Sequence, residues 1–365
     1  MASRTDPASP LRVAIVAPSL RFLGGQAVQA DRLLRAWQDD PDVRAWLVPH
    51  NPMPPAPIRF TLGTRFVRTI VTECLYVPLL LRELAHADIV HVFSASYWSF
   101  LLAPLPAVMV ARAFGRPVVL HYHSGEAPDH LARSTVARAV LARTSRNVVP
   151  SSFLADVFSG FGLRADIVPN LVDLAKFRFR ERQPLRPRIL STRNFEPIYN
   201  VACTLRAFQL VQQDCPEASL TLVGGGSEAP TLKALAEALD LRHVTFAGRV
   251  SPDVIAGYYD SHDLYVQSPD VDNMPVSVLE AYASGLPVVS TDVGGIPAIL
   301  THARHGLLAP AGDHQQLGRC LLQLLEDPQC ARALARNAFD TCHAYTWSTL
   351  RRQWLGIYRD TSSAN

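Results

Sequence analysis

Three carboxylates lie within eleven positions in the stretch SPDVDNMPVSVLEAY, which covers residues 268–282. Asp270 and Asp272 form a D-x-D pair, a spacing that can hold a divalent metal on a phosphate-bearing substrate. Asp272 and Glu280 form a second pair, separated by seven residues. The first question for this sequence is which pairing carries the chemistry, and whether that chemistry uses a metal.

The residues between the two pairs predict an anion site. Pro275 suits the first position of a helix, where its missing N–H is not needed. The amides around Asn273, Met274 and Val276 would then be free, with the positive end of the helix behind them, an arrangement suited to phosphate. Glu280 lies one turn further on the face of Val276, and its carboxylate can accept hydroxyl protons. Amide-bound phosphate beside carboxylate-bound hydroxyls describes a sugar nucleotide.

Short apolar runs alternate with helical patterns along the chain, which indicates parallel βαβ units. The strands expected form one series from 12–19 to 146–152 and a second from 186–195 to 287–295. The fold class predicted is α/β, with two Rossmann-like doubly wound parallel-sheet domains facing a central cleft. We expect an N-terminal domain over 1–168 and a C-terminal donor domain over 169–345, with a final helix (346–365) packing back on the first.

Composition favours a folded, cytoplasmic protein. Of the 365 residues, 48% are hydrophobic and 18% charged, which suffices for two packed cores. The six cysteines show no C-x-x-C or framework spacing, and the polar N-terminus lacks the layout of a signal peptide. No apolar run approaches the roughly 20 residues that span a bilayer. A net charge of +3 without a basic helix or motif argues against a nucleic-acid partner.

Residues 66–84 form a long apolar helix candidate with arginines near both ends. A peripheral membrane face is one interpretation, and it would put the protein at the inner face of the membrane. Glu73 and Pro78 interrupt the apolar pattern, so the favoured interpretation is a buried helix of the first domain.

Several motifs resemble those of one known family. The D-x7-E pair followed by AYASGLPVVSTDVGGIPAIL resembles the signature of the family 4 (group 1) retaining glycosyltransferases, which have GT-B architecture. APSLRFLGGQ is similar to that family's N-terminal glycine loop, VPSSFLADVF to its interdomain helix and IVPNLVDLAKF to its linker. VGGGSEAPTLKALAEAL matches its second domain. The order and spacing of these motifs cover most of the chain.

The resemblance implies roles on the donor side. Glu280 would bind the ribose hydroxyls, and Asp272 would contact the donor sugar where the family usually has glutamate. The shorter side chain puts the identity of the sugar in doubt. The resemblance also implies further donor-binding positions. Asn273, Met274, Pro275 and Val276 would hold the diphosphate and the sugar, and Gly248, Arg249 and Val250 would form the base pocket. Gly224, Gly225 and Gly226 would lie near the nucleotide, and a tight turn is the alternative for them.

Arg193 matches the family arginine that forks onto the donor diphosphate, a task suited to guanidinium. A surface arginine is the alternative. The lysine that the family usually carries five or six residues further on is absent, and this chain has Ile198, Tyr199 and Asn200 there. The departure implies either an altered donor site or weakened activity.

In the first domain, Gly24 and Gly25 follow the first strand and would allow close approach of a phosphate or acceptor, with a plain turn as the alternative. His123 matches the family's active-site histidine. His121 points the same way in a strand of period two, so one of the pair has a structural role, and His123 is favoured as catalytic. Glu126 and His121 are the acceptor-side candidates.

These residues predict transfer of a sugar from a nucleotide-diphosphate-sugar to an acceptor hydroxyl, with retention at the anomeric carbon and His123, Asp272 and Arg193 as catalytic residues. The donor is a substrate, and neither cofactor nor metal is expected, so the D-x-D spacing is interpreted as incidental. The acceptor stays open between a saccharide, a lipid-linked molecule and a small molecule. Two other functions fit parts of the pattern: a non-catalytic sugar-nucleotide-binding paralogue and a nucleotide-sugar epimerase of the same architecture.

Overall fold

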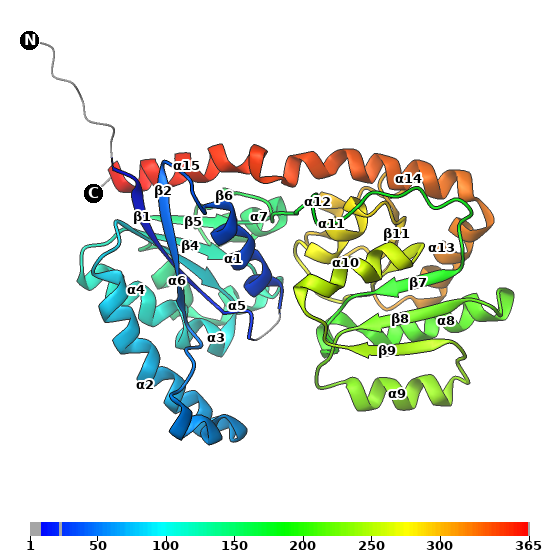
Figure 1. The fold of residues 1–365 in the computed structure, drawn as a ribbon, viewed down its shortest axis with the longest axis horizontal. Coiled ribbons are helices and arrows are strands. Elements are labelled where there is room, and N and C mark those ends of the chain that lie inside the picture. Colours follow the sequence, from blue (N-terminus) through cyan, green and yellow to red (C-terminus); the bar gives the residue numbers. More distant parts are fainter. Residues whose placement is uncertain (1–8, 22–23, 364–365) are drawn as a thin grey trace, which may run out of the picture. The chain divides into compact units, whose positions relative to one another are not determined.

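The computed structural model describes residues 9–21 and 24–363, which form two compact α/β units (Figure 1). Unit 1 comprises the described parts of 1–150, 154–168 and 350–365, and unit 2 comprises 151–153 and 169–349. Each unit is built on a parallel sheet, so the predicted α/β class with two Rossmann-like sheets is confirmed.

The described part of unit 1 has a six-stranded sheet in which every neighbouring pair is parallel. The strand order reverses between the first and third strands, because the chain adds β2 on one side of β1 and all later strands on the other. In sheet order the strands are β2 (Val43–Pro49), β1 (Leu11–Ala17), β3 (Ile89–Ser94), β4 (Val118–Tyr122), β5 (Arg146–Val149) and β6 (Asp166–Ile167).

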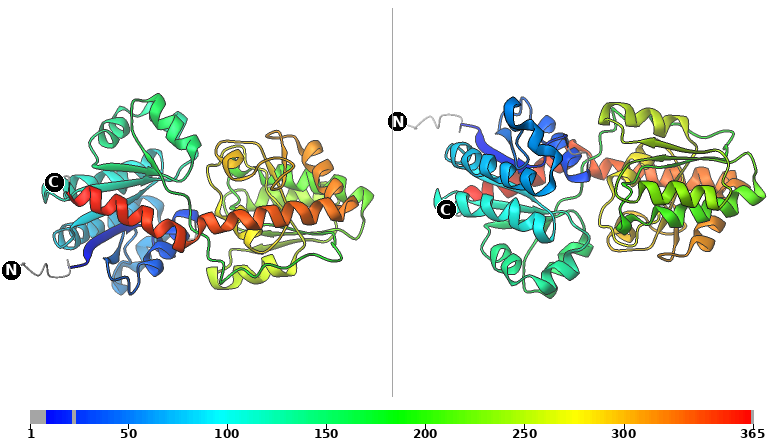
Figure 2. Two further views of the ribbon diagram at one scale, coloured as in Figure 1. Left: turned by 90° about the horizontal axis from the view of Figure 1, so that it is seen from above. Right: turned by 90° about the horizontal axis from the view of Figure 1, so that it is seen from below.

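Helices connect these strands and cover the sheet of unit 1 (Figure 2). They are α1 (Gly25–Ala36), α2 (Arg65–Leu84), α3 (Tyr97–Leu102), α4 (Pro104–Ala113), α5 (Ala127–Arg133), α6 (Thr135–Leu141) and α7 (Ser152–Gly160), with a 3-10 turn η1 (Ala56–Gly63) before α2. The last part of α15 (Trp347–Ser363) also packs here, and Figures 1 and 2 show it lying across the sheet. Its Arg351 pairs with Asp40 at 2.7 Å and with Asp42 at 2.6 Å.

Helix α2 buries one face and exposes the other. Tyr76 and Leu80 are fully buried, whereas Phe66 and Ile70 are 81% and 64% exposed. The helix continues through its internal proline. The expectation of a buried helix is therefore wrong for the outward face. Among the described residues no helix is both long and apolar enough to cross a membrane.

The described part of unit 2 also has a six-stranded parallel sheet. β8 and β9 follow β7 on one side of the sheet, and β10, β11 and β12 lie on the other side of β7. In sheet order the strands are β12 (Leu307–Ala309), β11 (Val288–Thr291), β10 (Leu264–Val266), β7 (Arg188–Ser191), β8 (Ser219–Val223) and β9 (Val244–Gly248).

Strand residues of unit 2 alternate between two apolar cores, as expected for a parallel sheet that is covered on both faces. Ile189 and Val266 face one core, and Leu190 and Tyr265 face the other. The first core is completed by α8 (Val201–Asp214), α9 (Ala229–Ala238) and α13 (His314–Glu326), and the second by α10 (Pro252–Ser261), α11 (Val276–Ala283) and α12 (Ile296–Ile299), while α14 (Pro328–Thr341) contributes to both. Two short turns, η2 (Pro197–Tyr199) and η3 (Cys342–Tyr345), complete the unit.

Candidate active site

The strand order of unit 2 reverses between β7 and β10, and sheets of this kind bind ligands beyond the carboxyl ends of the strands at such a point. Arg193 follows β7 and Asp272 lies in the loop that follows β10. The structure thus brings these two predicted site residues together at the switch point of one sheet.

Arg193 is held by three contacts. Its Nη2 donates to Asp272 Oδ2 at 2.6 Å, and its Nη1 lies 3.4 Å from Ser277 Oγ. The guanidinium carbon lies 4.1 Å from the centre of the Tyr199 ring, within the range of a cation–π contact. The Arg193 side chain is only 10% exposed, so the interpretation as a surface arginine is wrong.

Burial by itself lowers the pKa of Arg193, but the charge of Asp272 and the nearby tyrosines raise that pKa above its ordinary value. The guanidinium therefore stays charged while nearly withdrawn from water. A cation in such a position acts on a neighbouring anion with little solvent screening.

The loop after β10 is fixed by its own hydrogen bonds. Asp272 Oδ1 accepts from the amide of Asn273 at 2.8 Å, so the prediction that this amide is free to bind an anion is wrong. The Asn273 side chain accepts from the Ser151 hydroxyl, and the carbonyl of Met274 accepts from Asn170 Nδ2 at 2.8 Å. The buried side chains of Asn273 and Met274 thus shape the loop.

Helix α11 begins at Val276, and Pro275 is its N-cap residue, one position earlier than predicted. The amides of Val276 and Ser277 are at the start of the helix, where no acceptor exists in the preceding turn. These amides and the positive end of the helix dipole favour an anion. Because Ser277 also contacts Arg193, a helix start and a buried cation lie side by side.

Glu280 is 8% exposed and lies one turn into α11. Burial, followed by the charge of Glu280 and its hydrogen bond, raises the pKa of Tyr259 well above the ordinary value. The Tyr259 hydroxyl also lies 2.7 Å from Thr192 Oγ1 and 3.2 Å from the carbonyl of Ser277. Tyr259 therefore ties Glu280 to the end of β7. A role of Glu280 toward ribose hydroxyls stays a prediction.

The glycines after β8 let two loops pass in contact. A Cβ at Gly224 would lie 2.0 Å from the carbonyl oxygen of Arg193, and one at Gly226 would lie 2.3 Å from that of Phe195. Only glycine fits at such distances. Packing of this loop against the Arg193 loop therefore accounts for both glycines.

The predicted base-pocket residues lie at the end of β9. Gly248 has a positive φ of 74°, and its carbonyl accepts from the amide of Gly224 at 2.9 Å. The Arg249 side chain crosses Gly225, and its Nη2 lies 3.4 Å from the carbonyl of that residue. Val250 packs partly buried against the core. The ends of β7, β8 and β9 are thus joined, and base binding stays a prediction.

In unit 1 three neighbouring histidines form a row on one face of the sheet. His91 Nδ1 lies 2.8 Å from the Tyr358 hydroxyl, and His91 Nε2 lies 3.3 Å from His121 Nδ1. The ring centres of His121 and His123 are 4.0 Å apart. The two predicted histidines are therefore neighbours, and His121 is linked through His91 to α15.

These histidines are neutral at pH 7. Burial lowers the pKa of His91 and of His123 to about 3, and it lowers the pKa of His121 well below the ordinary value. Among the described residues the buried Nε2 atoms of His121 and His123 have no hydrogen-bond partner. Each can therefore donate to, or accept from, a ligand hydroxyl. Catalysis by His123 stays a prediction.

Gly24 caps the start of α1 in an extended conformation, and α1 begins at Gly25. A Cβ on either glycine would meet no atom within 4 Å, so neighbouring packing requires neither. Phe22 and Leu23, part of the predicted glycine loop, lie outside the described residues. Glu126 caps α5, and burial together with the charge of Asp129 raises its pKa.

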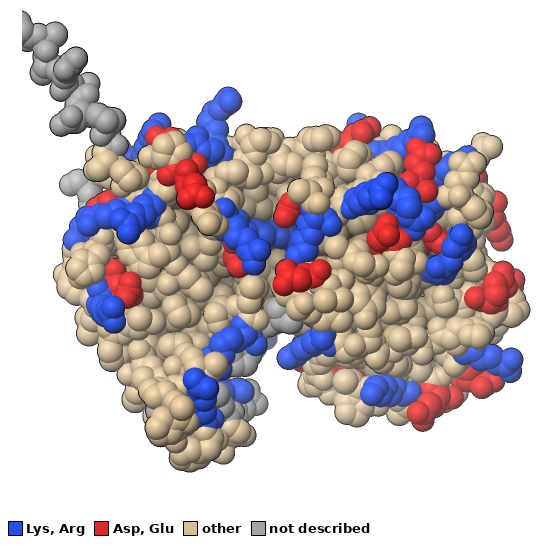
Figure 3. Space-filling model, in the orientation of Figure 1, with Lys and Arg blue, Asp and Glu red and all other residues tan. Residues whose placement is uncertain are grey.

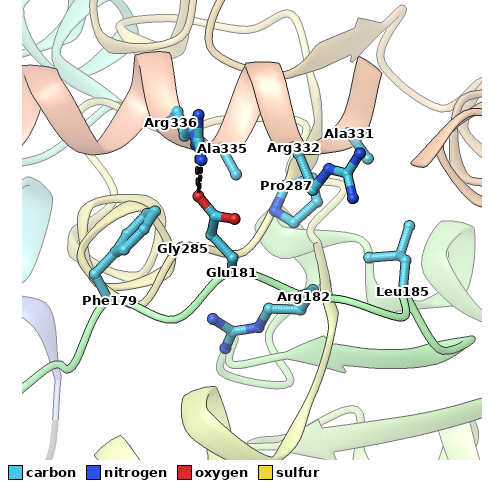
Figure 4. Close-up of a pocket in the computed structure, with 10 residues that line it drawn as sticks. All are labelled: Phe179, Glu181, Arg182, Leu185, Gly285, Pro287, Ala331, Arg332, Ala335 and Arg336. Carbon is cyan, nitrogen blue, oxygen red and sulfur yellow. Dashed lines mark hydrogen bonds and ion pairs between the residues drawn. The ribbon is translucent and has the colours of Figure 1, made fainter. Parts of the chain in front are cut away.

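A hollow in unit 2 lies between the linker after residue 178 and α14, and no predicted site residue lines it (Figure 4). Figure 4 shows Arg336 of α14 reaching to Glu181, with which it forms an ion pair. The buried Arg182 donates to the carbonyls of Tyr259 at 2.8 Å and His262 at 3.2 Å. These contacts give the hollow a structural role in fixing the linker.

The structure thus has two α/β units and a buried cation at the switch point of unit 2, and comparison with protein families identifies its class. Residues 23–176 match the model for Glycosyltransferase Family 4, and residues 175–341 match that for Glycosyl transferases group 1. The chain belongs to this family of glycosyltransferases, which have GT-B architecture.

Characterised relatives are glycosyltransferases. The chain is 26% identical to the sulfoquinovosyl transferase SQD2 of Arabidopsis thaliana over 74% of its own length and 56% of that protein's. It is 24% identical to the phosphatidyl-myo-inositol mannosyltransferase of Mycolicibacterium smegmatis, over 76% of its own length and 72% of that protein's. The chain thus spans little more than half of the first relative.

Solved structures share the fold. HepE from Anabaena in complex with UDP and glucose superposes with a TM-score of 0.74, covers 95% of this chain and 99% of that one, and is 18% identical. The sucrose-phosphate synthase of Thermosynechococcus elongatus has a TM-score of 0.77, covers 97% and 100%, and is 20% identical. At this identity the likeness establishes the fold.

Sequence reasoning missed most of the residues that surround the candidates. Tyr259 and Ser277 touch the Arg193 and Glu280 network, and His91 contacts both His121 and Tyr358. Tyr358 is 237 residues from His121, so no spacing could link them. Tyr199 was visible in the sequence, but it was noted only because it stands near the position where the family usually has a lysine.

Proposed function

We propose that this chain transfers a sugar from a nucleotide-diphosphate-sugar to an acceptor hydroxyl with retention of the anomeric configuration. The observation that carries the proposal is the buried Arg193 cation beside the start of α11 at the unit 2 switch point. A diphosphate there would meet a charge and helix amides with little screening by water. The HepE structure, which holds UDP and glucose, has the same fold and supports a nucleotide-sugar donor.

In the proposed reaction the acceptor oxygen attacks the anomeric carbon while the bond from that carbon to the diphosphate oxygen breaks. The acceptor proton passes to the departing diphosphate on the same face, so the configuration is retained. Negative charge grows on the diphosphate, where Arg193 and the amides of Val276 and Ser277 would stabilise it. His123 would hydrogen-bond a sugar hydroxyl, and Glu280 the ribose. The reaction needs no metal and no cofactor beyond the donor.

A thermal-shift panel of UDP-, GDP-, ADP- and TDP-sugars, with and without EDTA, tests donor binding. We expect one nucleotide class to raise the melting temperature, with no change on adding EDTA. Proton NMR of the first product then reports the anomeric configuration. Inversion, strict dependence on added Mn²⁺ or full turnover by Glu280→Ala would contradict the proposal.

We also propose a lipid-linked acceptor, reached through peripheral contact of α2 with the cytoplasmic face of a membrane. The outward face of α2 exposes Phe66, Ile70 and Leu81 (81%, 64% and 48%), and Phe60 just before it is 80% exposed. A contiguous apolar face of this kind on a soluble unit marks an interaction surface. Figure 3 shows this end of unit 1 as largely uncharged, with basic side chains beside it that are arginines, since the two lysines of the chain lie in unit 2; arginine suits anionic lipid.

Vesicle flotation tests the membrane contact. The protein should float with vesicles of phosphatidylcholine containing about 30% anionic phosphatidylglycerol and detach at high salt, because Debye screening weakens the attraction of arginine to the headgroups. Phe66→Ser/Ile70→Ser should abolish flotation, whereas Val254→Ser, which removes a 54% exposed valine of unit 2, should not. Equal flotation of all three proteins would contradict it.

A further inference from the structure

The Arg193 guanidinium is held by a set of side-chain contacts that the proposed donor chemistry does not itself require. Three segments that are distant in sequence converge on one guanidinium: η2 brings the Tyr199 ring, the loop after β10 brings Asp272, and the first turn of α11 brings Ser277. Both oxygens of Asp272 already accept from the protein, one from Arg193 and one from the Asn273 amide. Asp272 is thus engaged in holding Arg193 before any donor arrives.

The segment that carries Tyr199 is fastened to the loop that carries Asp272. Asn200, which has a positive φ of 40°, donates from Nδ2 to Asp270 Oδ1 at 3.0 Å, and its carbonyl accepts from Ser268 Oγ at 2.7 Å. The amide of Asp270 donates to the carbonyl of Ile198 at 2.9 Å. The two aspartates of the D-x-D spacing therefore have separate tasks: Asp272 binds the guanidinium, and Asp270 braces the turn that presents the ring.

One of the three guanidinium nitrogens of Arg193 makes no hydrogen bond to the described residues. Its Nε is buried and has no hydrogen-bond partner among the described residues, although Nη1 and Nη2 both have one. A buried donor without a partner is unfavourable and is completed by a ligand or a water. In an arginine the Nε and Nη2 hydrogens form a fork that matches two oxygens of one phosphate group.

We propose that Asp272 and Tyr199 are positioning residues that hold Arg193 as one fixed cation for the donor diphosphate, with the carboxylate setting its rotation and the ring supporting its face. The inference rests on the proposed function. It assigns Asp272 a role toward Arg193 in place of the predicted contact with the donor sugar. It also gives Tyr199 a positive role, since an aromatic face stabilises a desolvated guanidinium that a second ammonium would repel.

Calorimetric titration with UDP and GDP tests the role of the ring. Tyr199→Leu should weaken binding of whichever nucleotide the wild type binds by about tenfold, while Tyr199→Phe should stay within twofold because it keeps the ring. Tyr199→Met, which keeps much of the bulk without the ring, should weaken nucleotide binding as Tyr199→Leu does. It serves as a second variant in case Tyr199→Leu fails to fold. In an Arg193→Ala background, Tyr199→Leu should have no further effect.

Asp272→Asn separates positioning from sugar contact. If Asp272 positions Arg193, the variant should weaken the binding of UDP or GDP as much as the binding of the matching nucleotide-sugar, because the defect lies at the diphosphate. Weakening of the nucleotide-sugar alone, or unchanged binding in both Tyr199→Leu and Tyr199→Met, would overturn the inference and leave the proposed function intact. Absence of binding by the wild type to every nucleotide tried would overturn both.

Discussion

The buried polar side chains of the two units respond to burial in opposite ways. In unit 1, His91, His121 and His123 are withdrawn from water and become neutral, because no opposite charge compensates the loss of solvation. In unit 2, Arg193 is withdrawn to a similar degree and stays charged, because Asp272 lies 2.6 Å away. Burial alone therefore does not decide the charge of a strand-end group.

The contrast suits a division of labour in sugar transfer. Neutral imidazoles can exchange hydrogen bonds with the hydroxyls of a sugar, which carry no charge. A diphosphate needs a permanent cation, and a guanidinium fixed by a carboxylate supplies it without a change of protonation. The two clusters can therefore be tested separately, since each should respond to a different perturbation.

Removal of the unit 2 cation should give the largest effect. Arg193→Met leaves Asp272 buried without its partner, and we expect the free energy of unfolding to fall by about 3 kcal/mol. Urea denaturation measures the change. Arg193→Met/Asp272→Leu should regain most of the loss, because a buried pair replaced by apolar groups is often neutral in stability. If Arg193→Met is as stable as the wild type, the Arg193–Asp272 pair is not withdrawn from water, and this would contradict the structure.

Acid should act on the histidine cluster. The pKa of His91 and of His123 is about 3 in the folded protein against 6.5 when unfolded, so the unfolded chain binds more protons as the pH falls below 6.5. Stability is then full above pH 6.5 and is lost toward pH 3, by roughly 2.7 kcal/mol per pH unit for the two residues together. Urea denaturation at pH 7, 6 and 5 measures the slope.

The matched variants for this slope are His91→Phe and His86→Gln. The first removes one of the three buried histidines and should flatten the pH dependence by about a third, whereas the second removes an exposed one and should leave the slope unchanged. Equal slopes in all three proteins would show that the histidines are not the source of acid sensitivity.

The smallest effect should come from the hydrogen bond between α15 and the cluster. Burial raises the pKa of Tyr358, whose hydroxyl lies 2.8 Å from His91 Nδ1, and we expect this hydroxyl to donate to that nitrogen. His91 then carries its proton on Nε2 and donates to His121. Tyr358→Phe should lower the free energy of unfolding by about 1 kcal/mol.

Long-range ¹⁵N–¹H NMR of the imidazoles reports the tautomers directly. We expect the Nε2–H form of His91 in the wild type and a mixture of tautomers in Tyr358→Phe. The control is Tyr122→Phe, which breaks a similar 2.8 Å contact between a buried tyrosine and His130 in the same unit. It should cost similar stability without altering His91. An Nδ1–H form of His91 in the wild type would contradict the proposed order of donors.

Much of the architecture could be predicted because local patterns carry it. The strands expected at 12–19, 146–152, 186–195 and 287–295 are present as β1, β5, β7 and β11. The strands β2, β6 and β12 were not predicted. β6 and β12 have two and three residues, too few to show a period, and their pairing partners come from elsewhere in the chain.

The candidate site could be predicted only in part. Asp272 and Glu280 were recognised by type and spacing and Arg193 by its family resemblance. The amide of Asn273 was expected to be free, but it donates to the carboxylate of the preceding Asp272, and which rotamer that carboxylate adopts is not visible in the sequence. The outward face of α2 was expected to be buried, because an apolar helix looks the same in sequence whether or not another element covers it.

The sequence by itself determined the two sheets, the family and the residue types at the strand ends, since these depend on periodicity and on motifs within short windows. Only the tertiary structure decided which charges persist and what each carboxylate does. Asp270 and Asp272 acquire their roles from contacts across 70 and 79 residues of chain, and His91 and His121 are buried against Trp354 of α15. Protonation and pairing depend on the distance and burial of partners, and those exist only once the chain has folded.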